Sequence, residues 1–192
     1  EKKNIDLSVI MDSALANNYP TVVTSILEKN DPKIGIKQLS LLDDSFYSSK
    51  TLLVAVACGL KYNKTLRVIN IDYEELSKSK LHLVSLLAAV VYNLRFVSET
   101  EESDEVPADD DSNIILFRSI KEKLLNEARA IWKPFKGLKN SDLIDGILQV
   151  FTKNMVEGLS HETISGLQKE LDKQSFRLFI EICKSRHSGK KG

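Results

Sequence analysis

The chain has 192 residues, 42% of them hydrophobic, and a formal net charge of zero. This length supports one domain with a substantial core, and the hydrophobic content excludes a wholly disordered chain. The charge is unevenly spread, because residues 99–111 hold eight acids and no bases, leaving 27 bases against 19 acids elsewhere, a net charge of +8. That excess suits anionic partners but falls short of the excess in a dedicated nucleic-acid-binding protein.

Helical periodicity dominates the first part of the chain. Apolar residues at helical spacing predict a first helix from about Asp6 to Ala16, and Pro20 suits the first turn of a second helix. Asp31 and Pro32 repeat this pattern of cap and proline, which predicts a short third helix over residues 34–42. The residues expected to face the core in these helices are Leu7, Ile10, Met11, Ala14, Leu15, Val22, Val23, Ile26, Leu27, Ile34, Ile36, Leu39, Leu41 and Leu42.

Two longer helices, over residues 46–62 and 76–97, are expected to be central, because both are apolar on most faces. Between them, residues 66–71 are rich in β-branched side chains. A lone strand would have no partner, so this segment is interpreted as a short helix or an extended connector. No internal repeat with a period of 20–50 residues is evident, which disfavours a solenoid of stacked repeats.

Residues 98–113 are predicted to form a disordered acidic loop, with Asn113 capping the next helix. Amphipathic periodicity then predicts helices over 114–132, 143–156, 162–171 and 173–184.

The predicted fold is all-α: a multi-helix bundle or irregular helical array with a disordered acidic insertion. The expected organisation is an N-terminal helical group (1–97), the loop (98–113), a C-terminal helical group (114–186) that shares one domain with the first, and a basic tail (187–192).

The sequence shows no catalytic, phosphate-binding or metal-binding motif, so no enzyme, metal or cofactor is expected. The three histidines (His82, His161 and His187) have no ligand at a metal-binding spacing and are interpreted as structural. Cys58 and Cys183 are expected to be buried thiols, with a single bridge between them as the alternative. Trp132 is the only tryptophan, and it either packs in the core or anchors a protein partner.

Basic residues near the end of the chain are candidate contacts for nucleic acid. They are Lys184, Arg186, Lys190 and Lys191, beside His187. The alternative interpretation is a solvated terminus. No membrane partner is expected, since no run reaches 18 apolar residues. No small-molecule substrate is expected either, since the sequence shows no catalytic motif.

Residues 7–42 carry a family resemblance. The run Leu-Ser-Val-Ile-Met-Asp-Ser-Ala-Leu-Ala-Asn-Asn from Leu7, the run Val-Val-Thr-Ser-Ile-Leu-Glu from Val22 and the turn Asn-Asp-Pro-Lys-Ile from Asn30 resemble the opening of the C-terminal helical domain of WD-repeat subunits of the small-subunit processome. The resemblance implies three opening helices and a protein–protein assembly domain that pairs with sibling subunits in nucleolar pre-ribosomal RNA processing. The alternative from the charge is an RNA- or nucleocapsid-binding helical protein, either cellular or viral, for which a cytoplasmic location is also open.

Overall fold

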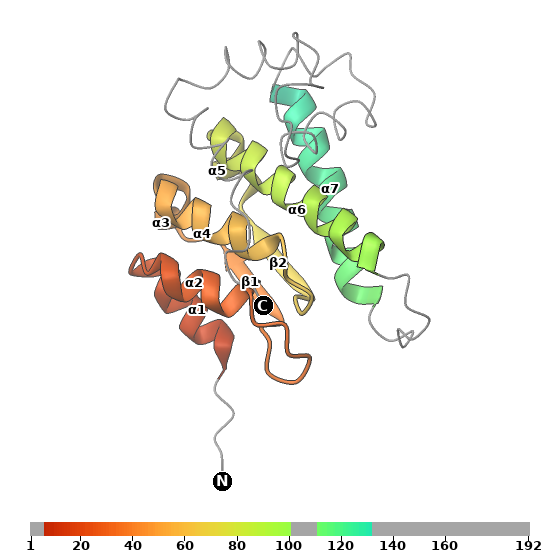
Figure 1. The fold of residues 1–192 in the computed structure, drawn as a ribbon. Helices are drawn as coiled ribbons and strands as arrows, with labels where there is room; N and C mark the ends of the chain where they lie inside the picture. The colour runs from red at the N-terminus through yellow and green to blue at the C-terminus, as the bar shows by residue number, and fades with distance from the viewer. Residues whose placement is uncertain (1–5, 101–110, 132–192) are drawn as a thin grey trace, which may run out of the picture.

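The computed structural model describes residues 6–100 and 111–131, apart from the side chains of 95–100, 111 and 131 (Figure 1). The prediction of a mainly helical chain is confirmed: these residues form seven helices and only two short strands. In chain order they are α1 (Leu7–Ala16), α2 (Pro20–Leu27), β1 (Gln38–Leu41), α3 (Asp44–Ser48), α4 (Lys50–Leu60), β2 (Val68–Ile71), α5 (Tyr73–Ser77), α6 (Lys80–Thr100) and α7 (Asp111–Ile131). The helices and tail expected after residue 132 lie outside the described residues.

The first two helices follow their predicted signals. The carboxylate of Asp6 accepts the Ser8 N–H at 2.9 Å and so caps α1, while Pro20 is the first residue of α2. The buried face of α2 is narrower than predicted, because Val22 is exposed whereas Val23, Ile26 and Leu27 are buried.

The two strands correct two predictions. The predicted helix over residues 34–42 is wrong, because Gln38–Leu41 form β1, and the interpretation of residues 66–71 is wrong, because Val68–Ile71 form β2. The strands pair in parallel, with Gln38 opposite Val68 and Leu41 opposite Ile71. A four-residue strand is not stable alone, and here two segments far apart in the sequence supply each other's partner.

Each predicted central helix is divided by a serine that caps its longer part. Ser49 separates α3 from α4, and its hydroxyl oxygen accepts the Leu52 N–H at 3.1 Å. Ser79 lies in the same way between α5 and α6. A serine at an N-cap satisfies a backbone N–H that has no partner within the helix, which favours a new helix start.

A thirty-residue repeat relates the two strand–helix units. Every pair of residues opposite each other in the sheet is thirty positions apart. Residues 36–65 and 66–95 are identical at six positions: Ser49/Ser79, Lys50/Lys80, Leu53/Leu83, Val54/Val84, Tyr62/Tyr92 and Asn63/Asn93. The expectation of no internal repeat is therefore wrong. The two units stack as in a solenoid, in which each repeat packs against the next.

Equivalent residues of the two units touch directly. The Asn93 side chain donates from Nδ2 to the carbonyls of Leu60 and Asn63, each at 2.8 Å. The rings of Tyr62 and Tyr92 meet edge-on, with centroids 5.7 Å apart. Helix α2 adds one more helix to the stack. The Asn63 Nδ2 donates to the carbonyl of Leu27, the last residue of α2.

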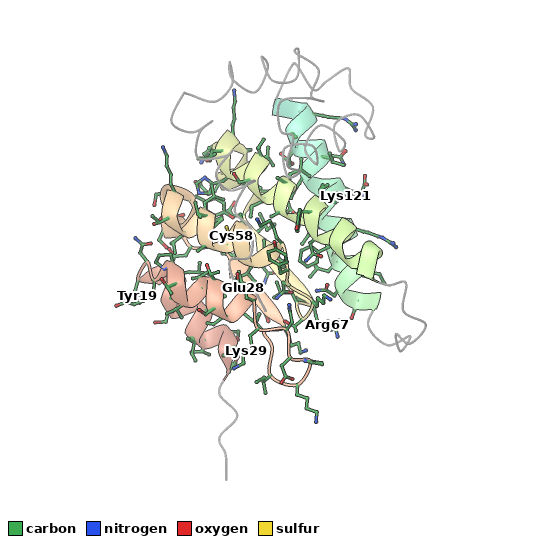
Figure 2. The ribbon with its side chains drawn as sticks, viewed as in Figure 1. Tyr19, Glu28, Lys29, Cys58, Arg67 and Lys121 are labelled. Atoms are coloured by element: carbon green, nitrogen blue, oxygen red, sulfur yellow. The ribbon has the colours of Figure 1, made fainter. Side chains whose placement is uncertain are left out.

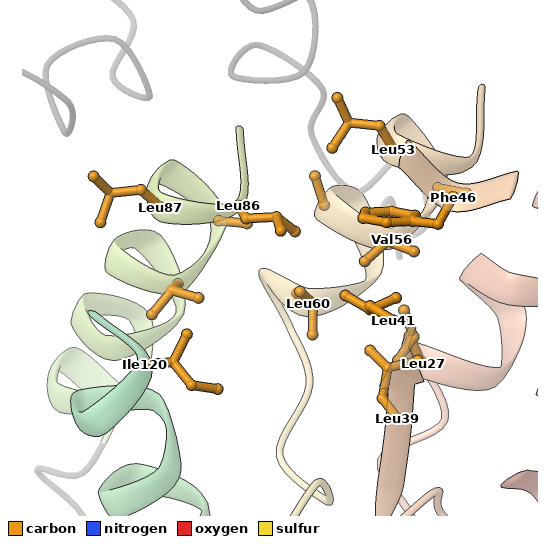
Figure 3. Close-up of a cluster of buried hydrophobic side chains, with 14 of the residues drawn as sticks. Leu27, Leu39, Leu41, Phe46, Leu53, Val56, Leu60, Leu86, Leu87 and Ile120 are labelled. Atoms are coloured by element: carbon orange, nitrogen blue, oxygen red, sulfur yellow. The ribbon is translucent and has the colours of Figure 1, made fainter. Parts of the chain in front are cut away.

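The core lies between the row of helices and the inner face of the sheet. Figure 3 shows Leu39 and Leu41 of β1 beside Leu27 of α2 and Val56 and Leu60 of α4. Gly59 permits close packing of α2 and α4, because a Cβ atom there would lie 2.5 Å from the Leu27 Cβ.

Helix α6 is buried around its whole circumference from Leu81 to Val91. It packs against α4, α5 and α7, and α7 runs back along it (Figure 1). The buried side of α7 is formed by Phe117, Ile120, Leu124, Leu125 and Ala128, which confirms the amphipathic helix predicted for this segment. No helix among the described residues has the length and apolar character needed to span a bilayer.

The boundaries of the predicted acidic loop are wrong at both ends. Residues 98–100 belong to α6 and residues 111–113 to α7, while 101–110 lie outside the described residues. Asn113 is a buried residue within α7 and not its cap. Its Nδ2 donates to the Leu66 carbonyl at 2.8 Å, which fixes the start of α7 against the residues that lead into β2.

Candidate interaction surfaces

Parallel pairing gives the sheet an amino edge, where both strands begin, and a carboxyl edge, where both end. Residues 28–37 and 61–67 form the amino-edge loops, which lead into β1 and β2. Helices α3 and α5 begin directly beyond the carboxyl edge. The outer face of the sheet, opposite the core, is the third surface.

The outer face of the sheet carries exposed apolar side chains among polar ones. Residues opposite each other point to the same side, so Gln38 and Val68 share this face with Ser40 and Asn70. The Asn70 Nδ2 donates to the Ser40 Oγ at 3.3 Å across it. Val68 is 45% exposed, and Leu42, the residue after β1, is 54% exposed.

The carboxyl edge is closed by capping hydrogen bonds. The Asp43 carboxylate accepts hydrogen bonds from Ser45, which lower the pKa of Asp43, and the Asp72 carboxylate accepts the Glu75 N–H at 3.1 Å. The Tyr47 hydroxyl donates to the carbonyl of Leu41 at 2.5 Å and accepts the Asp72 N–H at 3.0 Å. Burial raises the pKa of Tyr47 to about 12, so this hydroxyl stays protonated. These groups hold strand ends and helix starts together.

His82 has a structural environment, in keeping with its interpretation. Its Nε2 lies 2.9 Å from the Phe46 carbonyl, which can only accept, so Nε2 carries the proton. Its Nδ1 lies 2.6 Å from Ser79 Oγ and accepts from that hydroxyl. Burial lowers the pKa of His82. Within residues 6–100 and 111–131, no three or more His, Cys, Asp or Glu side chains gather as metal ligands.

The amino-edge loops are joined by side chains that act as backbone partners. Asn30 donates from Nδ2 to the Tyr62 carbonyl at 2.6 Å and accepts the Lys64 N–H at 2.8 Å. The Thr65 hydroxyl donates to the Ile36 carbonyl at 2.7 Å. The two loops therefore form one ordered unit.

Positive charge gathers on this unit. The amino-edge loops contain six bases, Lys29, Lys33, Lys37, Lys61, Lys64 and Arg67, against two acids, Glu28 and Asp31. Four of the lysines are exposed, Arg67 is partly buried and Lys61 is buried. Figure 2 labels Lys29 and Arg67 on the two loops. The opposite end carries the acids Asp43, Asp44, Asp72, Glu74 and Glu75.

Most of the residues singled out from the sequence are not among those that the structure describes. Trp132 and the basic residues Lys184, Arg186, Lys190 and Lys191 are outside the described residues, as is Cys183. Cys58 lies in α4 and is partly buried, less than predicted. Sequence reasoning missed both the outer sheet face and the amino-edge loops. The signal that could have found them is the thirty-residue spacing, which pairs the strands and so brings the two loops together.

No protein-family model, curated protein or solved structure matches this chain. Its function is therefore inferred from its own surfaces.

Proposed function

We propose that this chain is a non-enzymatic assembly module that holds protein subunits of a nucleolar pre-ribosomal RNA processing complex. The observation that carries the proposal is the exposed outer face of the β1–β2 sheet. Parallel sheets almost always have both faces covered, because the crossover connections place helices on them. Here Leu39 and Leu41 of β1 are buried in the core on one side of the sheet, while Leu42 and Val68 remain exposed. A protein partner would supply the second cover.

The composition of the outer face suits a protein partner. Two exposed apolar side chains stand beside Gln38, Ser40 and Asn70, which offer amide and hydroxyl groups. Val68 lies at the amino edge of this face and Leu42 follows its carboxyl edge, with Ser40 and Asn70 between them. A mixture of apolar and polar side chains is the usual composition of a protein–protein interface. Stacked strand–helix repeats also commonly bind partners over an extended face formed by successive repeats.

The nucleolar complex is the part of the proposal that rests on the resemblance of residues 7–42. Helices α1 and α2 occupy the positions that the resemblance gives to its first two helices, whereas its third helix corresponds to β1. The alternative, direct binding of RNA or of a nucleocapsid, stays a second proposal. Its predicted contacts in the tail lie outside the described residues, but the charge of the amino-edge loops favours it.

Co-purification of processome subunits with a tagged chain tests the proposal. We expect L42D/V68E, which places two acids on the outer sheet face, to lose these subunits. The matched control V9D/I115E replaces two other exposed apolar residues, 64% and 62% exposed, and is expected to retain them. Both variants should unfold at the temperature of the unaltered chain. Absence of processome subunits from the unaltered chain, or equal recovery with both variants, would contradict the proposal.

A further inference from the structure

We propose that the amino-edge loops bind the sugar–phosphate backbone of RNA. The inference does not depend on the proposed protein-binding face, because it concerns the loops at the amino edge of the sheet. The surface consists of the exposed lysines Lys29, Lys33, Lys37 and Lys64 with the partly buried Arg67. RNA phosphates are bound chiefly by lysine and arginine, which displace the counterions condensed on the polymer.

The parallel fold concentrates this charge at one end of the molecule. Residues 28–37 and 61–67 are separated in sequence, but both loops enter the sheet at the same edge. Together they contain six bases and two acids. One of the acids, Asp31, is engaged within its own loop, because its Oδ1 accepts the Lys33 N–H at 2.8 Å. Most of the acids near the sheet lie at its opposite edge. The potential is therefore directional and would orient an approaching polyanion.

The loops are ordered before any ligand binds. Asn30 joins the two loops, and the Arg67 N–H donates to the Lys37 carbonyl at 2.7 Å. Gly35 lies so close to its neighbours that a Cβ atom would be 2.5 Å from the Thr65 Cγ2. A surface whose backbone is already fixed loses little conformational entropy on binding.

The chemistry of the surface favours a phosphate backbone over an acidic protein. Ile34, 51% exposed, is the one exposed large apolar residue within these loops, whereas protein interfaces depend on buried aromatic and apolar anchors. The aromatic rings at this edge are engaged with each other, since Tyr62 packs on Tyr92 and the Lys61 Nζ lies 5.5 Å from the Tyr92 ring centroid. Recognition should therefore depend on charge and not on base sequence.

Fluorescence anisotropy with a labelled 20-nucleotide single-stranded RNA of mixed sequence tests the proposal on the full chain. Neutralising about four phosphates predicts a slope of about −2.8 for log affinity against log salt, or about a 50-fold loss between 50 and 200 mM salt. A second RNA of unrelated sequence should bind within about threefold of the first, since base contacts are absent. No binding at 50 mM salt, or binding indifferent to salt, would overturn the proposal.

A pair of charge-matched variants locates the surface. K29Q/K33Q/K37Q removes three charges from the amino edge, and we expect its salt slope to fall to about −0.7 with at least a tenfold weaker affinity at 50 mM salt. K50Q/K78Q/K123Q removes three charges near the carboxyl edge: Lys50 begins α4, Lys78 pairs with Glu75, and Lys123 lies over the Tyr73 ring. This control should bind RNA within about twofold of the unaltered chain.

Thermal unfolding shows whether each variant is folded. Should the triple amino-edge variant unfold, K33Q compared with K50Q gives the same test with one charge, and a loss of about threefold is expected for K33Q alone. Equal weakening in both variants of a pair would overturn the proposal. RNA binding that persists in the amino-edge variant would place the contact in another basic segment and would also overturn it. A polyglutamate peptide that binds more tightly than RNA would assign the surface to an acidic protein instead.

Discussion

Replacing Asn63 with alanine tests whether this side chain holds the stacked units together. Its Nδ2 donates to the Leu27 carbonyl at 2.9 Å, and its Oδ1 accepts the N–H groups of Thr65 at 3.1 Å and Leu66 at 2.9 Å. All four residues are buried. Truncation leaves three buried backbone groups without this partner, each costing about 1–3 kcal/mol. Water entering the vacated space would recover part of this, so we expect a loss of about 3–5 kcal/mol in the free energy of unfolding.

Urea unfolding followed by circular dichroism at 222 nm measures this loss by linear extrapolation. The control is Asn70→Ala, because Asn70 is partly buried and makes one side-chain hydrogen bond, at 3.3 Å, to Ser40. The control should lose less than about 1 kcal/mol. An Asn63→Ala protein within about 1 kcal/mol of the unaltered chain, or no less stable than Asn70→Ala, would refute the reasoning.

Three further predictions use the same unfolding assay. Gly59→Ala should destabilise the fold by about 1–3 kcal/mol, because its Cβ would lie 2.5 Å from the Leu27 Cβ. The loss should persist in a Leu27→Ala background, since alanine keeps that Cβ atom, and a Gly59→Ala protein as stable as the unaltered chain would refute this. Tyr47→Phe should cost about 1–3 kcal/mol, since it removes hydrogen bonds to the backbone at the ends of both strands; an unchanged urea midpoint would contradict this. Burial lowers the pKa of His82 from 6.5, so its contribution to stability is complete above pH 6.5 and is lost as the pH falls through the lower pKa of the folded state. His82→Gln should therefore weaken the fall in stability between pH 7.5 and 5, and an undiminished fall would exclude His82 as its source.

The helices could be predicted where the signals are local. The Asp6 cap, the position of Pro20 and the apolar stripe of α7 each lie within a few residues, so the sequence alone locates these elements. The strands depend on pairing between segments thirty residues apart, and no local pattern reports that pairing. Local periodicity therefore predicts a helix over residues 34–42, which leaves residues 68–71 without a partner strand.

The candidate surfaces were missed for the same reason. The sequence shows that Lys33 and Lys64 are basic, but it does not show that they are neighbours. Only the parallel pairing of the strands brings their loops to one edge. The repeat itself is visible at six of thirty positions, too few to stand out without the strand register as a guide. Two of the identities join residues that touch in the fold, namely Tyr62 with Tyr92 and Asn63 with Asn93.

The complete burial of α6 has a consequence for synthesis of the chain. Residues 81–91 present no polar side on which the helix could remain soluble before its neighbours fold around it. Helix α7, which packs along it, is complete only at residue 131, forty residues later. At about 5–20 residues per second, translation leaves this apolar segment without its last neighbour for about 2–8 seconds. We expect the nascent chain to bind chaperones that recognise exposed apolar segments during that interval.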